Sequence, residues 1–334
     1  MPAMHYKKII NTIEVTAPPY LAEDWDNSGV QVASRKTEIA SMAVALDPSW
    51  KTVFQACEQD FDFLLCHHPL SLKPSLPSTV NHYHYILKAL LGKDAWLYSA
   101  HTSLDVNPGG PASWLADKLG LENGKTILPT YTISPLRLEF SPALPGSAQT
   151  EIEEIFYPLE LKKDSGDIRE VTIWSDRENG FLSFINARFP DTRTRSFQLR
   201  SPAKKFGLGL CGSLERELPA DSFLQLLKEQ MDITGSRFVG DPPEKIKKVA
   251  YCPGSGADLA TRAFGMGADV YITGDIKYHQ AQDIEEHGFA LDVGHFILEE
   301  EMMRNWCGQL QKQLPELKIS FIPGKDPFRA EIKK

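Results

Sequence analysis

The chain has 334 residues, 42% of them hydrophobic and 24% charged, with a formal net charge of −8. This composition is typical of a globular protein, and the negative charge argues against nucleic acid or a membrane surface as a partner, because both are anionic. No apolar run approaches the roughly 20 residues that span a bilayer. Five widely spaced cysteines without a C-x-x-C pair, and an N-terminus without a signal-peptide pattern, favour the cytoplasm.

The first 66 residues predict a helix followed by a β-α-β unit. Apolar periodicity gives helices over 6–15 and 49–59 and buried strands over 39–46 and 61–66. Parallel strands joined by such a helix are almost always connected with a right-handed crossover. Before the first strand, the sequence A-E-D-W-D-N-S-G at 22–29 is typical of a tight loop, for which we favour a structural role.

Two adjacent histidines, His67 and His68, follow the second strand, and Pro69 stops the strand from continuing in a sheet centre. Both imidazoles therefore lie at the carboxyl end of a strand, where open α/β sheets bind their ligands. Neighbouring side chains of an extended segment point to opposite sides, so the pair could serve two metal ions. The alternative is a surface turn with two polar rings.

A second polar pair, His101 and Asp105, follows a strand predicted over 95–100. A carboxylate beside imidazoles is the usual composition of a hydrolytic metal site. For His101 we favour the role of orienting a ligand over direct ligation, because ligands generally need an outer partner. His82 and His84 fall in a predicted helix over 80–91 and are expected on its surface.

The segment from 121 to about 201 has a different texture, with frequent prolines and alternating apolar residues. It predicts strands over 136–140, 157–161, 168–174 and 194–200 and helices over 147–156 and 177–188. This β-α-β-β-α-β order is that of the ferredoxin-like split unit. Residues 181–184 could equally extend a strand.

Two glycine-rich segments follow. F-G-L-G-L-C-G-S-L at 206–214 does not fit the spacing of a phosphate-binding P-loop and favours a strand with close backbone contacts. P-G-S-G at 253–256 lies between a predicted strand and a helix. It could bind an anion at the helix N-terminus or be an ordinary short β-α loop, and the local sequence favours neither.

Polar groups also follow the strands predicted over 269–272 and 289–293. The first strand leads into G-D-I-K-Y-H, which contains His279, and the second into G-H-F-I-L-E-E. In the latter, His295 and Glu299 are four residues apart on a predicted helix, so they share a face at about 6 Å. That spacing lets an imidazole and a carboxylate converge on the same metal.

Together these strand ends supply five candidate metal ligands: His67, His68, Asp105, His295 and Glu299. Nitrogen and oxygen donors without a thiolate suit Zn, Fe or Mn. Three imidazoles and two carboxylates could hold two divalent ions, which in hydrolytic sites lie about 3.5 to 4 Å apart and share an activated water.

The order of these motifs resembles that of the NIF-three-like dinuclear-metal family, whose members are often labelled GTP cyclohydrolase type 2 homologues. The matching segments are A-E-D-W-D-N-S-G-V-Q-V, L-L-C-H-H-P-L, H-T-S-L-D, G-S-G, G-D-I-K-Y-H, G-H-F-I-L-E and the terminal D-P-F. They cover about 120 residues before the middle segment and about 130 after it.

The resemblance implies an α/β fold of two related lobes, with mixed or parallel sheets around a dimetal cleft, interrupted by an inserted ferredoxin-like α+β lobe. We place the lobes at 1–130 and 202–334 and the insert at 131–201. The family's metal ligands match His67, His68, Asp105, His295 and Glu299, with Glu299 as the bridge. The family also implies a toroidal homohexamer. The insert is shorter than is usual in the family, and its motifs do not match closely.

The implied activity is metal-dependent hydrolysis of a small molecule, with a nucleotide as a candidate because of the family label. Opening a guanine ring requires an activated water and a group that moves a proton, for which His101 or His279 could serve. The sequence shows no motif for reading guanine or binding a triphosphate. A metal-handling protein, such as a chaperone or insertase, is the alternative, and a hydrolase of phosphoesters or amides is a third hypothesis.

Overall fold

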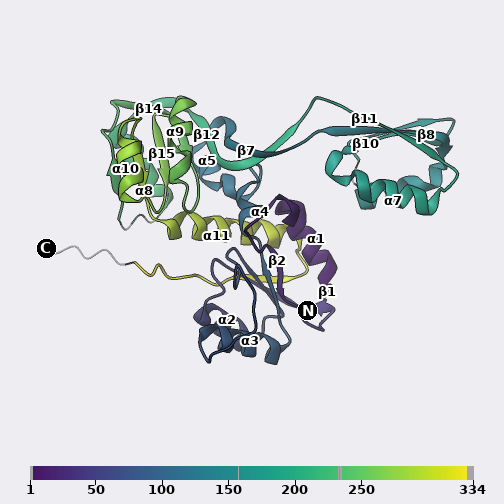
Figure 1. The fold of residues 1–334 in the computed structure, drawn as a ribbon, viewed down its shortest axis with the longest axis horizontal. Coiled ribbons are helices and arrows are strands. Elements are labelled where there is room, and N and C mark those ends of the chain that lie inside the picture. Colours follow the sequence, from purple (N-terminus) through teal and green to yellow (C-terminus); the bar gives the residue numbers. More distant parts are fainter. Residues whose placement is uncertain (1–2, 157, 232, 234, 329–334) are drawn as a thin grey trace. The chain divides into compact units, whose positions relative to one another are not determined.

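The computed structural model describes residues 3–156, 158–231, 233 and 235–328, which form two compact units (Figure 1). The larger unit combines residues 1–130 with 206–334, and the smaller one comprises 131–205. None of the helices formed by the described residues has the length and apolarity needed to cross a bilayer.

One sheet of the larger unit has five strands. In spatial order they are β17 (Lys318–Phe321), β4 (Ser41–Ala45), β5 (Phe63–Cys66), β6 (Trp96–Ser99) and β2 (Gly29–Val32). Only β2 runs antiparallel to its neighbour. The first helix is α1 (Tyr6–Thr16), and the crossover helices are α2 (Trp50–Glu58) and α3 (His82–Lys93). The β-α-β unit predicted from residues 39–66 is therefore confirmed.

The other sheet of this unit has six strands, with three parallel strands at its centre. In spatial order they are β13 (Arg237–Val239), β16 (Ala290–Asp292), β15 (Val270–Thr273), β14 (Lys245–Tyr251), β12 (Lys204–Pro219) and β7 (Glu122–Ile133). The associated helices are α8 (Ala220–Gln230), α9 (Ala260–Gly265), α10 (Tyr278–Glu285) and α11 (His295–Gln313). The glycine-rich segment 206–214 lies in β12, so its prediction as a strand is confirmed. A Cβ on Gly207 would lie 2.0 Å from the Leu128 carbonyl oxygen of β7, which explains why glycine is needed there.

Each sheet incorporates a strand from the opposite end of the chain. β17 joins the sheet of the N-terminal residues, and β7 joins the sheet of the C-terminal residues. Helix α11 starts directly after β16 and packs against β4 and β17 (Figure 1). Its Met302 and Trp306 are fully buried in a core cluster that also contains residues of both sheets, such as Val44 and Ile272. The first and last parts of the chain therefore share one core.

The smaller unit has the element order predicted for the middle segment. Its elements are β8 (Pro135–Leu144), α6 (Gln149–Phe156), β9 (Glu160–Asp164), β10 (Asp167–Trp174), α7 (Glu178–Arg188) and β11 (Arg193–Gln198). The antiparallel sheet has the order β11-β8-β10-β9. Phe181 is fully buried on α7, so 181–184 continues a helix and not a strand. The strand predicted over 157–161 begins at Glu160, and residue 157 lies outside the described residues.

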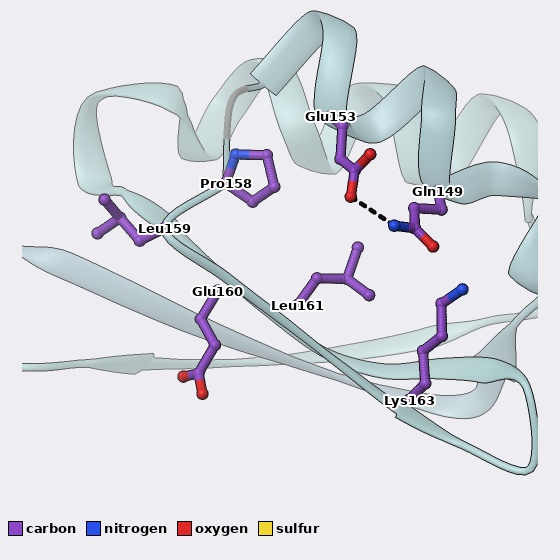
Figure 2. Close-up of a pocket in the computed structure, with 7 residues that line it drawn as sticks. All are labelled: Gln149, Glu153, Pro158, Leu159, Glu160, Leu161 and Lys163. Atoms are coloured by element: carbon purple, nitrogen blue, oxygen red, sulfur yellow. Dashed lines mark hydrogen bonds between the residues drawn. The ribbon is translucent and has the colours of Figure 1, made fainter.

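A pocket of about 810 Å³ lies in this unit, between α6 and β9, and Figure 2 shows the side chains that line it. Its described lining residues are Gln149, Glu153, Pro158, Leu159, Glu160, Leu161 and Lys163. The Gln149 amide donates to the Glu153 carboxylate within the same helix. None of these lining residues is a histidine or cysteine, so the pocket lacks the donors that transition metals prefer.

Candidate metal centre

Three pairs of the predicted side chains meet at the carboxyl ends of parallel strands. His67 and His68 directly follow β5, and His101 and Asp105 follow β6, with Asp105 ending the one-turn helix α4 (Thr102–Asp105). His295 and Glu299 lie in the first turns of α11, just after β16. Gly294 precedes α11 with φ +87°, a conformation that favours glycine and starts the helix at His295. Two sheets thus contribute to one cluster.

The Glu299 carboxylate is at the centre of the cluster and is only 4% exposed. Its Oε1 is 3.6 Å from His67 Nε2, while its Oε2 is 3.1 Å from His68 Nε2 and 2.9 Å from His295 Nε2. Burial raises the pKa of Glu299, but the imidazoles of His67 and His295 outweigh burial and hold that pKa well below its usual range. The carboxylate is therefore charged, and its two oxygens face different histidines.

Asp105 also approaches the imidazole of His67 at Nε2. Its Oδ1 is 3.7 Å from His67 Nε2. Burial raises the pKa of Asp105, against the lowering effect of His67. His67 itself is fully buried, which opposes its protonation, yet the Asp105 and Glu299 carboxylates raise its pKa above the ordinary value. The pocket around His67 therefore favours a positive charge.

The donor atoms form two overlapping groups that could each hold a metal ion. One consists of His67, His68 and His101, and the other of His68, His295 and Glu299, with all donor atoms of a group within 4.8 Å of one another. His68 belongs to both. The structure therefore brings His101 into the cluster, beside the residues predicted as ligands.

Each imidazole is held by an acceptor at Nδ1, which directs its Nε2 toward the cluster. The acceptor is Asp47 for His68 at 2.7 Å, Asp26 for His101 at 2.7 Å, Asp275 for His295 at 2.8 Å and the Ala100 carbonyl for His67 at 2.9 Å. Histidines that bind metals almost always donate their other ring nitrogen to such a carboxylate or carbonyl. The arrangement fixes both the tautomer and the orientation of the four rings.

The carboxylates also determine the charge of the cluster. Burial lowers the pKa of His68, but the carboxylates of Asp47 and Glu299 raise it to about 10. For His295 the interaction with Glu299 is the largest effect and raises the pKa to about 9. A site that stabilises protonated imidazoles this strongly also stabilises a metal cation that replaces those protons.

A direct test of fit is whether buried polar atoms lack partners. Four atoms of the cluster are buried without a hydrogen-bond partner among the described residues: His67 Nε2, Asp105 Oδ1, His295 Nε2 and Glu299 Oε2. The 2.9 Å between His295 and Glu299 is thus a close ion-pair distance without the angle of a hydrogen bond. Leaving such atoms unsatisfied is costly. These nitrogen and oxygen donors suit a divalent transition metal.

The P-G-S-G loop at 253–256 makes room for the central carboxylate. Gly254 has φ +64°, and a Cβ there would lie 2.2 Å from Glu299 Oε1. The N–H of Gly256 donates to Thr273 Oγ1 at 2.9 Å. Of the two interpretations of this loop, the structure favours a short β-α loop with close backbone contacts over an anion site.

Sequence reasoning missed two of the orienting carboxylates. Asp26 lies in the loop interpreted as structural, where its side chain accepts from Thr102 and Ser28 as well as His101. Burial raises the pKa of Asp26, but His101 and Thr102 hold it well below its usual range. Asp47 lies two residues after β4, and His67 lies directly after the neighbouring strand β5. Their shared position at the same sheet edge could have identified Asp47 from the sequence.

His279 does not join this cluster. It is exposed on α10, where its Nδ1 lies 3.2 Å from Gln282 Oε1. His82 and His84 lie on α3, exposed and half-buried respectively, in line with their predicted surface position. Of the two histidines considered for moving a proton, the structure places only His101 beside the other imidazoles.

The fold and the cluster define a mixed α/β protein whose histidines and carboxylates could bind metal. The family Duf34/NIF3 (NGG1p interacting factor 3) matches residues 4–327, and the chain belongs to this family. A protein of Staphylococcus aureus strain Mu50 is 27% identical over 368 residues, covering 98% of this chain and 100% of its own. One of Staphylococcus epidermidis is 28% identical over 367 residues, with the same coverage. Both are named GTP cyclohydrolase 1 type 2 homolog.

Solved structures agree with this family assignment. A Bacillus cereus protein related to NIF3 is 25% identical, with a TM-score of 0.82 over 98% of this chain and 99% of its own. Reduced HcgD from Methanocaldococcus jannaschii is 24% identical, with a TM-score of 0.65 over 96% of this chain and 98% of its own. At that identity the second likeness concerns the fold alone.

Proposed function

We propose that the cluster is a two-metal centre and that the protein is a metal-dependent hydrolase of the kind named in its relatives. The ligands are His67, His68, Asp105, His295 and Glu299. The observation that carries the proposal is the set of buried, unpartnered donor atoms that face one another around Glu299. The chemistry of these donors suits Zn, Fe or Mn.

Glu299 is suited to bridge two ions because its oxygens face separate histidines. Oε1 lies on the side of His67 and Asp105, and Oε2 on the side of His68 and His295. A divalent metal held by these residues would supply Lewis acidity and activate water at neutral pH. The protein's part is to turn each Nε2 toward the cluster and to raise its basicity as a ligand, which the acceptors at Nδ1 achieve.

His101 is the residue we assign to proton movement. Its Nδ1 is fixed by Asp26, so its Nε2 is the nitrogen that faces the cluster. Asp26 cannot turn away, because Thr102 and Ser28 donate to the same carboxylate. A histidine locked in one orientation beside a reacting group is a suitable general acid or base.

We propose a small molecule as substrate, with a nucleotide first among the candidates because of the relatives' name. We also propose that 131–201 is an inserted ferredoxin-like lobe, supported by its β-α-β-β-α-β order and its strand order β11-β8-β10-β9. The toroidal homohexamer and the lobes at 1–130 and 202–334 remain predictions. A cytoplasmic location is supported by the five cysteines, all free and buried.

The metal assignment is tested by elemental analysis of the purified protein. We expect about two metal ions per chain in the wild type and a loss of metal in His67→Ala and Glu299→Gln. His82→Ala is the matched control, because His82 is an exposed histidine on α3. Unchanged metal content in both ligand variants would disprove the site.

The enzymatic assignment is tested separately, by screening nucleotides and phosphoesters with Mn- or Zn-loaded protein. Turnover that disappears in Glu299→Gln and persists in His82→Ala supports a hydrolase. The alternative, a metal-handling protein, is favoured by one observation: the His295 side chain is 33% exposed, so solvent reaches the ring that carries one of the ligand atoms. Rapid exchange of bound metal without turnover of any substrate would support that alternative.

A further inference from the structure

A large aromatic side chain is exposed directly beside the histidine cluster. Trp25 is 57% exposed, although an indole is among the side chains most favoured in protein interiors and interfaces. Its ring is 5.7 Å from the His101 ring, at an interplanar angle of 79°. Trp25 therefore contacts His101, and His101 belongs to the same group of donors as His67 and His68.

The loop that carries Trp25 is fixed on both sides of it. The N–H of Glu23 donates to Thr102 Oγ1 at 3.0 Å, and the N–H of Asp26 donates to the Glu23 carbonyl at 2.9 Å. The Asp26 side chain is bound to His101 and Thr102. A loop with these ties holds the indole in place, so Trp25 offers a preorganised surface at little entropic cost.

We propose that Trp25 is the ring-stacking residue of the substrate site and takes a planar heterocycle, such as a nucleobase. This inference rests on the proposed function, because it assumes that a substrate approaches the cluster. Bases stack on aromatic side chains whatever their hydrogen-bonding edges, since every base has a π-face. A stacking residue therefore explains how a ring could bind in a chain without a motif that reads guanine.

The charge of the cluster acts on a phosphate and leaves a neutral ring unaffected. Five carboxylates surround the four imidazoles: Asp26, Asp47, Asp105, Asp275 and Glu299. They repel an anion when the site is empty, whereas bound metal would attract one. A neutral nucleoside is free of both effects, so its ring can be tested apart from any phosphate.

The experiment measures binding by isothermal titration calorimetry with full-length, Mn-loaded protein. The probes are guanosine, which has a ring and no phosphate, and ribose 5-phosphate, which has a phosphate and no aromatic ring. The variants are Trp25→Leu and Trp25→Phe, with Phe54→Leu as the control. Phe54 is an exposed aromatic residue, 43% accessible, whose ring contacts Trp50 on α2 and not the cluster.

We expect Trp25→Leu to raise the Kd of guanosine about tenfold, which corresponds to about 1.4 kcal/mol. The Kd of guanosine for Trp25→Phe lies between those of Trp25→Leu and the wild type, because phenylalanine retains an aromatic face. Phe54→Leu leaves the Kd of guanosine within about twofold. The Kd of ribose 5-phosphate and the metal content stay unchanged in every variant.

Three results would overturn the proposal. The first is wild-type protein that does not bind guanosine, and the second is an unchanged Kd of guanosine in Trp25→Leu. The third is a loss of metal, or an equal loss of both probes, in Trp25→Leu, which would show that Trp25 only positions His101. Failure of the proposed hydrolase is read elsewhere, as absent turnover by metal-loaded protein, and does not alter these binding constants.

Discussion

The histidine cluster of the larger unit and the pocket of the smaller unit satisfy their polar groups in opposite ways. In the pocket, Glu153 and Lys163 are exposed, and the Gln149 amide donates to Glu153. In the cluster, His67 Nε2, His295 Nε2 and Glu299 Oε2 are buried and lack hydrogen-bond partners among the described residues. Water satisfies the first set, whereas the second set requires a ligand.

The difference shows which feature marks a binding site in this molecule. Size does not, because the pocket is large and has an ordinary charged surface. A binding site is marked by buried, unpaired donors that converge, because burying them without partners lowers the stability of the fold. Four predictions would break or sharpen this distinction.

The largest effect is expected for Gly254→Ala. Its new Cβ would lie 2.2 Å from Glu299 Oε1, and φ +64° strains any side chain there. The carboxylate must move, so we expect loss of most of the bound metal and a decrease of about 1 to 3 kcal/mol in the free energy of unfolding. Elemental analysis and denaturant unfolding measure the two effects.

Gly92→Ala is the control for that variant. Gly92 lies within α3, and a Cβ there meets no atom within 4 Å. Replacing glycine by alanine inside a helix stabilises by roughly 0.5 to 1 kcal/mol. Full metal content in Gly254→Ala would show that Glu299 is not held where the cluster requires it.

Metal removal should affect the two units unequally. At a free metal concentration about 100 times the Kd, binding stabilises the folded state by about 2.7 kcal/mol. We expect a chelator to increase amide hydrogen exchange around β5 and the start of α11, and to leave 131–205 unchanged. Hydrogen exchange measured by mass spectrometry resolves the two regions.

The matched control is Glu299→Gln, in which the chelator should have little left to remove. If the exchange of 131–205 changed as much as that of β5, the smaller unit would also hold metal. The contrast between cluster and pocket would then be false.

A smaller loss is expected when the acceptors at Nδ1 are changed. Asp47→Asn and Asp275→Asn keep the shape of the side chain but remove the charge that orients His68 and His295. Replacing such an outer partner typically lowers metal affinity by about 10- to 100-fold. Competition with a chelating dye measures that affinity.

Asp94→Asn is the control for these two variants. Asp94 pairs with Arg35 on the surface of the same unit, away from the imidazoles. An exposed ion pair of this kind contributes little to the free energy of unfolding. Equal metal affinity in all three variants would mean that the acceptors do not tune the cluster.

The sequence predicts the cluster better than it predicts the surroundings of the cluster. His67, His101 and His295 follow apolar runs that end abruptly, so their place at strand ends is visible locally. Asp26 reaches His101 only because two loops 75 residues apart meet, and no local pattern encodes that contact. His279 was assigned by its motif, but α10 begins at Tyr278 and leaves the ring exposed.

The fold shows the same limit. The central strands of both sheets are apolar and were predicted, whereas β7 was missed because its burial pattern is mostly exposed. The placement of β17 beside β4 also depends on a contact between opposite ends of the chain. Which strand occupies a sheet edge is decided by tertiary packing, which a single sequence does not display.

The smallest effect is expected in the pocket of the smaller unit (Figure 2). Glu153→Ala and Lys163→Ala remove exposed charges, and surface substitutions of this kind usually change the free energy of unfolding by less than about 0.5 kcal/mol. We expect unchanged metal content and unchanged binding of guanosine, measured as for the other variants. Because this pocket has a volume of about 810 Å³, a loss of either property would show that size, and not burial of unpaired donors, identifies the site in this protein.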